Sequence, residues 1–355
     1  MLLYLCVFSF FLVLYRIGEE HDDKLFLFLS ILIPSLFEGL RNVDVGTDML
    51  GYGSQWFEYM DEKDSVWNML GSAQTPEYAY HSLIYVCKKI SPNIHLFMTV
   101  CALIKMSSVV AFAYKMKDSI SSILFLFSYY CFFYVTSFSM MRQGIAIAIC
   151  IYSLSYFMNH ERIKFLIAIF VAYLFHNSAI LMALLIPIFY LRNYKYKYPI
   201  ILGGSLFVYL SIGLIFNLVL MTPLFKSEMA DLYLDSGVPS AKTNILISLV
   251  FIGYTLYLYR FSEDDINERV YYSLATSSLT LFFLLLSSFI EVAFRMSYYM
   301  FIVSVCVMLL FMNNSIKYKR IEMYSFVSLF LLHFYFACAH GLVGALDYKS
   351  EILGF

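Results

Sequence analysis

The sequence predicts an all-α protein that crosses a membrane many times. Hydrophobic residues make up 61% of the 355 residues and charged residues only 14%, whereas about a quarter of the residues in an ordinary soluble domain are charged. The mean hydropathy is +0.74. The apolar residues also form long runs, and about 20 of them in a row suffice for one helical span. These three observations argue against a soluble enzyme and predict a single transmembrane domain over residues 1–355.

About twelve segments (roughly 10 to 13) are long and apolar enough to cross the hydrocarbon core. We expect spans near 1–17, 25–41, 93–113, 119–138, 141–158, 163–176, 178–191, 199–220, 243–260, 270–290, 295–313 and 322–341. The segments 163–176 and 178–191 are short and meet at His176, so they form either two spans or one broken element.

Lysine and arginine gather in every second loop between these spans. They are Arg16 and Lys24, Lys115 and Lys117, Arg162 and Lys164, Arg192 to Lys197, Arg260 and Arg269, and Lys317 to Arg320. Short loops rich in these residues stay in the cytoplasm, so we expect both termini on the outer face. The long loops 41–92 and 221–242 then also lie outside. The amphipathic piece 77–90 ends in two lysines and is expected along the membrane surface.

Charged residues that break this pattern fall together at the outer ends of spans. They are Arg41, Asp48, Arg142, His176, Glu291 and Arg295. Ionisable groups at membrane depth are costly and by default indicate a functional site. Guanidinium groups bind phosphate oxygens through paired hydrogen bonds and stay charged at any relevant pH. The alternative is that each arginine anchors its helix at the interface, with its stem in lipid and its head in water.

Arg142 has the strongest case for an anion site. It opens the apolar run MRQGIAIAICIYSLSYFM, and the free N–H groups at a helix start favour an anion. Gln143 adds donors, and Gly144 lets another helix approach closely. We therefore predict that Arg142, Gln143, Arg295 and Arg41 bind a phosphate or pyrophosphate group.

Further polar and aromatic residues each carry two interpretations. Asp48 follows a Gly-Thr turn, so it either caps a helix beginning near Met49 or belongs to the functional site that the outer charges indicate. His176 is either a satisfied histidine between helices or a functional residue, acting as a general base or as an oxyanion donor. Rings such as Trp56 stack on sugars or pack at the interface, and Glu77 is either an N-terminal charge or a substrate ligand. The predicted sugar contacts are Asp44, Tyr52, Trp56, Glu77 and Tyr298.

Several motifs resemble a known family in their order and spacing. RNVDVGTDMLGYGSQWF, EYAYHSLIY, MRQGIAIAICIYSLSYF, FHNSAILMALLIPIF and FRMSYYMFI follow one another along the chain. Together they are similar to the EpsG-like branch of the Wzy polymerases, which make bacterial O-antigens, capsules and exopolysaccharides. LDYKSEIL also resembles the family's frequent Y-x-x-x-L ending. Where the family often has Glu-Pro-Gly, this chain has Glu77-Tyr78-Ala79.

The resemblance implies a membrane glycosyltransferase of the broad GT-C type. Such an enzyme transfers a growing glycan from undecaprenyl pyrophosphate to a lipid-linked repeat unit at the outer face of the bacterial inner membrane. The arginines would stabilise the pyrophosphate leaving group, and His176 or Asp48 would take the proton of the acceptor hydroxyl. It implies no nucleotide, metal or other cofactor. The implied partners are the lipid-linked donor and acceptor, membrane lipid and a chain-length regulator, and the near-neutral net charge gives no sign of nucleic acid.

Three other activities remain open at this level. An O-antigen ligase usually has a large outer loop late in the chain, and 221–242 is short for that. A flippase or other transporter needs charges along a path through the bilayer, and only Lys105 fits that pattern. An acyltransferase needs a His-Asp site facing a cytoplasmic acyl donor, and His176 is predicted on the opposite side.

Overall fold

The computed structural model describes residues 2–60, 77–204, 206–207, 210–211, 241–261, 267–287, 291–314, 319–340 and 344–354. Within these ranges the chain is helical and contains no strand. Eight apolar helical segments are long enough to cross a membrane: Leu2–His21, Ile94–Lys115, Ser122–Ser139, Met141–Met158, Lys242–Arg260, Asn267–Leu286, Ala293–Asn313 and Arg320–Ala339. The prediction of an all-helical, polytopic membrane protein is therefore confirmed. The count of about twelve spans, the GT-C likeness and the orientation stay predictions.

The chain divides into two compact units, each described here by itself. Unit 1 comprises Met1–Ile180 and Arg320–Phe355, and unit 2 comprises Leu181–Lys319. Unit 1 contains the predicted residues from Arg41 to His176. Arg295 and Tyr298 belong to unit 2.

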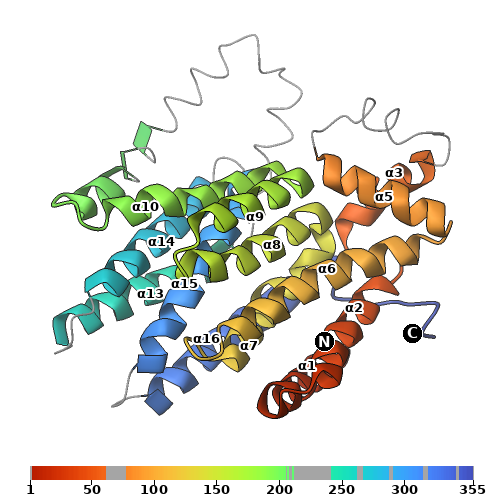
Figure 1. Cartoon of the computed structure of the whole chain (residues 1–355), viewed down its shortest axis with the longest axis horizontal. Coiled ribbons are helices and arrows are strands. Elements are labelled where there is room, and N and C mark those ends of the chain that lie inside the picture. The colour runs from red at the N-terminus through yellow and green to blue at the C-terminus, as the bar shows by residue number, and fades with distance from the viewer. Residues whose placement is uncertain are drawn as a thin grey trace, which may run out of the picture. The chain divides into compact units, whose positions relative to one another are not determined.

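A row of packed helices forms the body of unit 1 (Figure 1). The helices are α1 (Leu2–His21), α2 (Lys24–Gly39), α6 (Ile94–Lys115), α8 (Met141–Met158) and α9 (Arg162–Phe175), and α16 (Lys319–Ala339) also belongs to unit 1 from Arg320 onward. In this row α2 packs on α1 and α6, and α8 packs on α6 and α9. Small residues permit the close approach, since a Cβ on Gly39 would lie 2.5 Å from the Thr99 Cα atom. Asp23 and Asn93 cap α2 and α6 by accepting backbone N–H groups.

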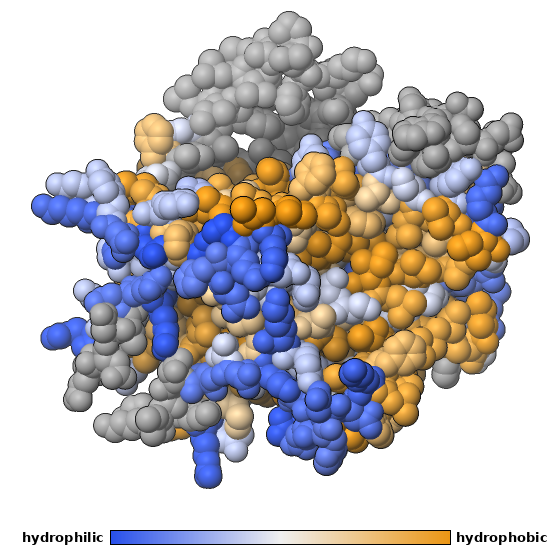
Figure 2. All heavy atoms as spheres, viewed as in Figure 1, coloured by the Kyte–Doolittle hydropathy of each residue, from blue (hydrophilic) through white to orange (hydrophobic). Residues whose placement is uncertain are grey.

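Large apolar side chains are exposed along these helices. On α1 and α2 they include Phe10, Val13, Leu25 and Phe28. Figure 2 shows hydrophobic side chains covering much of the face in view, with hydrophilic side chains gathered beside them. A soluble protein rarely exposes apolar patches of this extent, so the pattern agrees with helices that face lipid.

Two breaks in the helices of unit 1 position the candidate site. The predicted span 119–138 consists of α7 (Ser122–Tyr129), η3 (Tyr130–Tyr134) and η4 (Thr136–Ser139), after which the chain turns and starts α8. The second break is at His176, where the backbone is extended between α9 and the 3-10 helix η5 (Asn177–Leu184). The two short apolar segments meet at His176, as the sequence predicted.

The described part of the first long loop contains three helical segments. It contains η1 (Met49–Gly53), α3 (Ser54–Tyr59) and α5 (Tyr78–Ile90). The bounds of α5 agree with the predicted helix at 77–90, and its buried residues Tyr80, Ile84 and Cys87 belong to a core shared with Phe57 and Phe97. The position of α5 along a membrane surface stays a prediction. Nearly all of the second loop, 221–242, lies outside the described residues.

Unit 2 contains α10 (Leu185–Leu191), η6 (Pro199–Gly203), α13 (Ala241–Phe261), α14 (Asn267–Leu286) and α15 (Glu291–Asn314). Within it, α14 packs on both α13 and α15. The buried hydroxyls of Thr255 and Ser273 join α13 to α14 at 2.6 Å, and the Tyr271 hydroxyl donates to the Ile188 carbonyl at 2.8 Å.

Candidate active site

The loop that follows α2 is organised around the side chain of Arg41. This guanidinium is fully buried. Its Nε donates to Val45 O at 2.9 Å, its Nη1 to Glu38 O at 2.6 Å and its Nη2 to Phe138 O at 3.1 Å. It also lies 4.8 Å from the centre of the Phe138 ring. These three bonds to backbone carbonyls favour a role for Arg41 in holding the loop, and its pyrophosphate contact stays a prediction.

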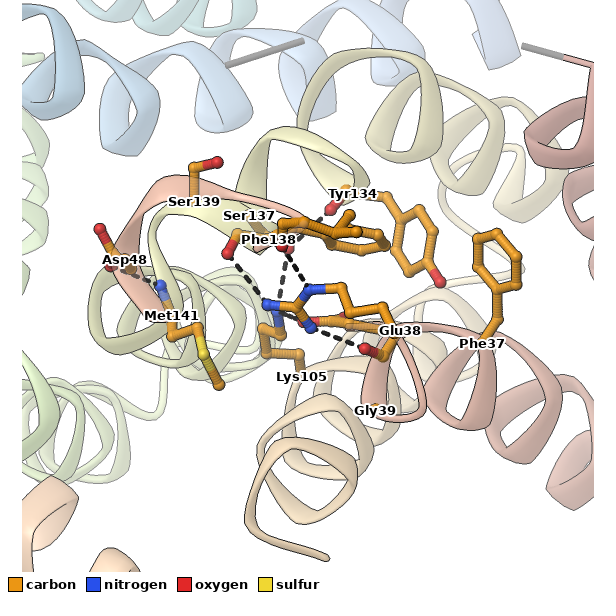
Figure 3. A network of polar contacts seen from close by, with 12 residues as sticks. Phe37, Glu38, Gly39, Asp48, Lys105, Tyr134, Ser137, Phe138, Ser139 and Met141 are labelled. Atoms are coloured by element: carbon orange, nitrogen blue, oxygen red, sulfur yellow. Dashed lines mark hydrogen bonds and ion pairs between the residues drawn. The ribbon is translucent and has the colours of Figure 1, made fainter. Parts of the chain in front are cut away.

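The same loop holds the turn that precedes α8 (Figure 3). Gly46 has a φ of +91°, and a Cβ there would lie 2.8 Å from Phe138 O, so only glycine fits without strain. The Thr47 N–H donates to Ser139 Oγ at 3.1 Å. The Met141 N–H donates to Asp48 Oδ2 at 3.0 Å. Asp48 therefore supplies an N-terminal cap to α8, whereas its side chain makes no capping bond to the helix at Met49.

Lys105 contacts the turn before α8 and forms a buried ion pair with Glu38 (Figure 3). Its ammonium group contacts the Glu38 carboxylate and donates to Ser137 Oγ at 2.9 Å. Both ionic side chains are buried. The stem of Lys105 passes over Gly144, where a Cβ would lie 3.2 Å from Lys105 Cδ. The predicted close approach at Gly144 is therefore present, and the approaching helix is α6.

A segment near the end of the chain covers the other side of the loop. The Asn42 N–H donates to Lys349 O at 2.8 Å, and Ser350 Oγ donates to Leu40 O at 2.5 Å. The Tyr348 ring stacks on Phe37 with centroids 4.0 Å apart, and its hydroxyl donates to Phe37 O at 2.7 Å. Residues 344–354 thus hold the loop at residues 40–48 in place, and this loop in turn positions the start of α8.

Arg142, Glu77 and His176 come together beside the start of α8. The Arg142 guanidinium forms an ion pair with the Glu77 carboxylate, and His176 Nε2 lies 3.7 Å from Glu77 Oε1. The Glu77 side chain is only 4% exposed, while those of Arg142 and His176 are 17% and 26% exposed. The cluster therefore has a buried carboxylate with two partly accessible basic groups beside it.

Ser178 and Gln143 orient the imidazole of His176. The Ser178 N–H donates to His176 Nδ1 at 3.2 Å, and Ser178 Oγ lies 2.7 Å from the same nitrogen. Gln143 Nε2 donates to Ser178 Oγ at 3.5 Å. Because Nδ1 accepts a backbone N–H, the proton of neutral His176 is assigned to Nε2, which faces Glu77.

Trp56 provides an aromatic wall for the cluster. The Arg142 guanidinium carbon lies 4.8 Å from the centre of the indole ring, and the His81 ring lies 4.9 Å from it. Burial, followed by the positive charge of Arg142, lowers the pKa of His81 to about 4. His81 is therefore neutral at physiological pH, and Arg142 remains the charged partner of the indole face.

The remaining predicted residues lie apart from this cluster or are not placed with it. Asp44 is half exposed, with Lys349 Nζ 3.8 Å away. Tyr52 is in η1, and its side chain lies outside the described residues. Arg295 and Tyr298 lie on α15 in unit 2, so their approach to Arg142 stays a prediction. Among the described residues, no group of three His, Cys, Asp or Glu side chains is placed to hold a metal ion.

Sequence reasoning gave no role to several residues that shape the site. Glu38 was not singled out, although an opposite charge on a neighbouring span is a natural partner for Lys105. Ser178 and His81 were also missed. The spacing of His176 and Ser178 carried a usable signal, because a serine two residues after a helix-ending histidine can bond back to the ring.

A sequence model of the EpsG family matches residues 24–350, which is most of the chain. The chain belongs to the EpsG family. The matched region includes Arg41, Glu77, Arg142 and His176, and it extends into the segment at Tyr348. No curated protein and no solved structure matches the chain. Membership of the EpsG family, together with the eight apolar helical segments, indicates a polysaccharide polymerase embedded in a membrane.

Proposed function

We propose that this EpsG-family protein is a Wzy-type glycosyltransferase acting at the outer face of the bacterial inner membrane. It would transfer a growing glycan from undecaprenyl pyrophosphate to the sugar of a lipid-linked repeat unit. The observation that carries the proposal is the partly exposed guanidinium of Arg142 at the start of α8, beside the acidic and basic pair of Glu77 and His176. The family match supports polymerisation in general.

Arg142 is the residue we propose for the pyrophosphate leaving group. As the bond from sugar to phosphate breaks, negative charge grows on the phosphate oxygens. A guanidinium offers those oxygens paired, charge-assisted hydrogen bonds, and it lies at a helix N-terminus that favours an anion. Fixed charge of this kind lowers the barrier because it needs no reorganisation during the reaction. In this proposal Gln143 orients the site through Ser178, and Arg295 remains a second candidate for the pyrophosphate.

The aromatic and capping residues take supporting roles. Trp56 lies against Arg142, where its ring can carry the face of a sugar next to the pyrophosphate. Asp48 and Arg41 hold the start of α8, so we propose that they position Arg142 without touching the substrate. No step in this scheme needs a metal or nucleotide, because the lipid-linked donor already carries an activated anomeric carbon.

The test is the length of the glycan in host cells that lack the gene and receive a variant. Replacing Arg142 with Ala should leave the protein in the membrane and reduce the ladder to single repeat units. Arg142→Lys keeps the charge without the paired donors, and we expect short chains. Arg16→Ala is the matched control, because Arg16 is half exposed on α1 and outside the site. A normal ladder from Arg142→Ala would contradict the proposal.

The glycans in the same cells distinguish a polymerase from an O-antigen ligase and from a flippase. Loss of a polymerase leaves single units that still reach the final acceptor. Loss of an O-antigen ligase leaves full-length polymer on the lipid carrier, and loss of a flippase leaves lipid-linked units on the inner leaflet. Either of the last two results for Arg142→Ala would replace polymerisation with that activity.

A further inference from the structure

The carboxylate of Glu77 is placed by its tertiary contacts. Glu77 precedes α5 directly, yet its side chain makes no capping bond to that helix. Instead the carboxylate is buried, with Arg142 on one oxygen and His176 Nε2 3.7 Å from the other. A carboxylate is rarely buried unless it is paired. The chain therefore holds a negative charge in the place that an anionic ligand of Arg142 would contact.

The neighbouring groups are less suited to accept a proton. His176 receives the Ser178 N–H on Nδ1 and directs its own Nε2 proton toward Glu77. The Asp48 carboxylate caps α8 through the Met141 N–H. Within the described part of unit 1, Glu77 is thus the acidic side chain that lies against Arg142 and has a histidine donor to steady it.

We propose that Glu77 is the general base of the polymerisation, and that Arg142 holds it inactive until a pyrophosphate binds. This inference rests on the function proposed above. An adjacent guanidinium favours the ionised carboxylate and makes it a weak base. A pyrophosphate carries more charge than one carboxylate and matches the guanidinium fork. When it takes Arg142, the Glu77 oxygen that faced the arginine is released toward the acceptor hydroxyl.

The bonds and charges of this step balance without a further reactant. The acceptor hydroxyl oxygen forms a bond to the anomeric carbon of the donor, and its proton passes to Glu77. The bond between that carbon and the pyrophosphate oxygen breaks, and its electron pair leaves with the pyrophosphate, which gains one negative charge beside Arg142. Glu77 returns the proton to solvent when the product leaves, and Arg142 pairs with it again.

Trp56 supplies a spectroscopic readout. The chain has two tryptophans, Trp56 and Trp67, so Trp67→Phe leaves Trp56 as the single reporter. Because the Arg142 guanidinium lies over the Trp56 ring, a change of its ionic partner should change the indole fluorescence. Undecaprenyl pyrophosphate is the probe for binding to the full chain in lipid nanodiscs. Lipid-linked repeat units extracted from host cells lacking the gene are the substrate for turnover.

Binding of undecaprenyl pyrophosphate and turnover of the repeat units are then measured in Glu77→Gln and Glu77→Asp. Glu77→Gln removes the competitor for Arg142, so undecaprenyl pyrophosphate should bind several-fold more tightly. Loss of a general base lowers turnover by about 100-fold or more. A general base also makes the rate fall at acid pH, where it is protonated, and this fall should be absent from Glu77→Gln. Glu77→Asp keeps a carboxylate and should recover about ten-fold of that loss. It also provides the test if the glutamine variant does not fold.

Three results would overturn the inference or its basis. Turnover of Glu77→Gln within about three-fold of the unchanged protein would show that Glu77 is not the base, since base catalysis contributes far more. Weaker binding of undecaprenyl pyrophosphate to Glu77→Gln would instead make Glu77 a substrate ligand. Unchanged binding of undecaprenyl pyrophosphate to Arg142→Ala would contradict the pyrophosphate role proposed for Arg142, whatever Glu77 does.

Discussion

Asp48 and Met141 are 93 residues apart, and the Met141 N–H donates to Asp48 Oδ2 at 3.0 Å. The acceptor that satisfies the start of α8 therefore comes from the loop after α2. Arg142 is the next residue of α8, so its position depends on this bond. A helix cap is normally a local contact, and here it joins two segments that are distant in the sequence.

Asp48→Asn separates this capping role from a role as general base. Asparagine accepts a hydrogen bond at a helix start about as well as aspartate, whereas alanine loses about 1 kcal/mol. We expect Asp48→Asn to keep most of the glycan ladder and Asp48→Ala to shorten it. Thermal unfolding in detergent should rank the variants in the same order. If Asp48→Asn makes no polymer while its unfolding temperature is unchanged, Asp48 takes part in the chemistry.

The buried pair of Lys105 and Glu38 should behave as a coupled unit. Lys105→Met leaves the buried Glu38 carboxylate with Arg41 Nη1 3.9 Å away from Oε1, and losing one partner of a buried pair costs about 3–5 kcal/mol. The double variant Lys105→Met with Glu38→Gln should cost less than the sum of the single changes, because no carboxylate is then left buried. The free energies of unfolding of the unchanged protein, Lys105→Met, Glu38→Gln and the double variant give the coupling energy between the two side chains.

An exposed ion pair serves as the control for this cycle. Lys164 and Glu161 are 2.8 Å apart and largely exposed on unit 1, and such pairs contribute about 0–1 kcal/mol. Lys164→Met should therefore change stability little. Equal effects at Lys105 and Lys164 would mean that the buried pair contributes no more than a surface contact.

Much of the fold follows from local sequence patterns. The apolar runs predicted helices long enough to span a membrane, because length and hydropathy are properties of each segment alone. The bounds of α5 followed from its amphipathic pattern and its basic end, and the break at His176 from the length of the two runs that meet there. These features depend little on the rest of the chain.

The site was predicted less completely because its contacts are tertiary. Arg41 and Arg142 share the same sequence signal, an arginine at the outer end of a span. Only packing separates them, since Arg41 is enclosed by carbonyls and Arg142 lies beside Trp56 and Glu77. The sequence likewise predicted a helix cap as one of two roles for Asp48. It indicated the helix near Met49, the nearest in the chain, whereas the structure places the cap on α8. The placement of Arg295 with Arg142 stays a prediction.

Tyr348 should affect the site through the loop at residues 40–48. Tyr348→Phe keeps the stacking on Phe37 and removes one hydrogen bond, which costs about 1 kcal/mol. We expect a near-normal ladder from it. Tyr348→Ala removes the ring as well and should shorten the ladder markedly at unchanged protein level. Ile352→Ala is the control, because Ile352 is exposed in the same segment. An unaltered ladder from Tyr348→Ala would show that the segment is dispensable for positioning.

His81 should make the protein less stable in acid. The pKa of His81 falls from 6.5 to about 4 in the folded chain because of burial, followed by the charge of Arg142. Between these pH values the unfolded chain binds more protons, so stability is complete above about pH 6.5 and falls as the pH drops toward 4. This shift in the pKa of His81 corresponds to at most about 3 kcal/mol in the free energy of unfolding. Unfolding temperatures measured from pH 7.5 to 4 should show this loss.

Two variants test the assignment of this acid sensitivity. His81→Asn should flatten the decline, whereas His21→Asn, at an exposed histidine, should leave it unchanged. Arg142→Met removes the second cause of the depressed pKa, so the decline should begin at the same pH but become smaller. A decline that is the same in His81→Asn as in the unchanged protein would assign the acid sensitivity to other groups.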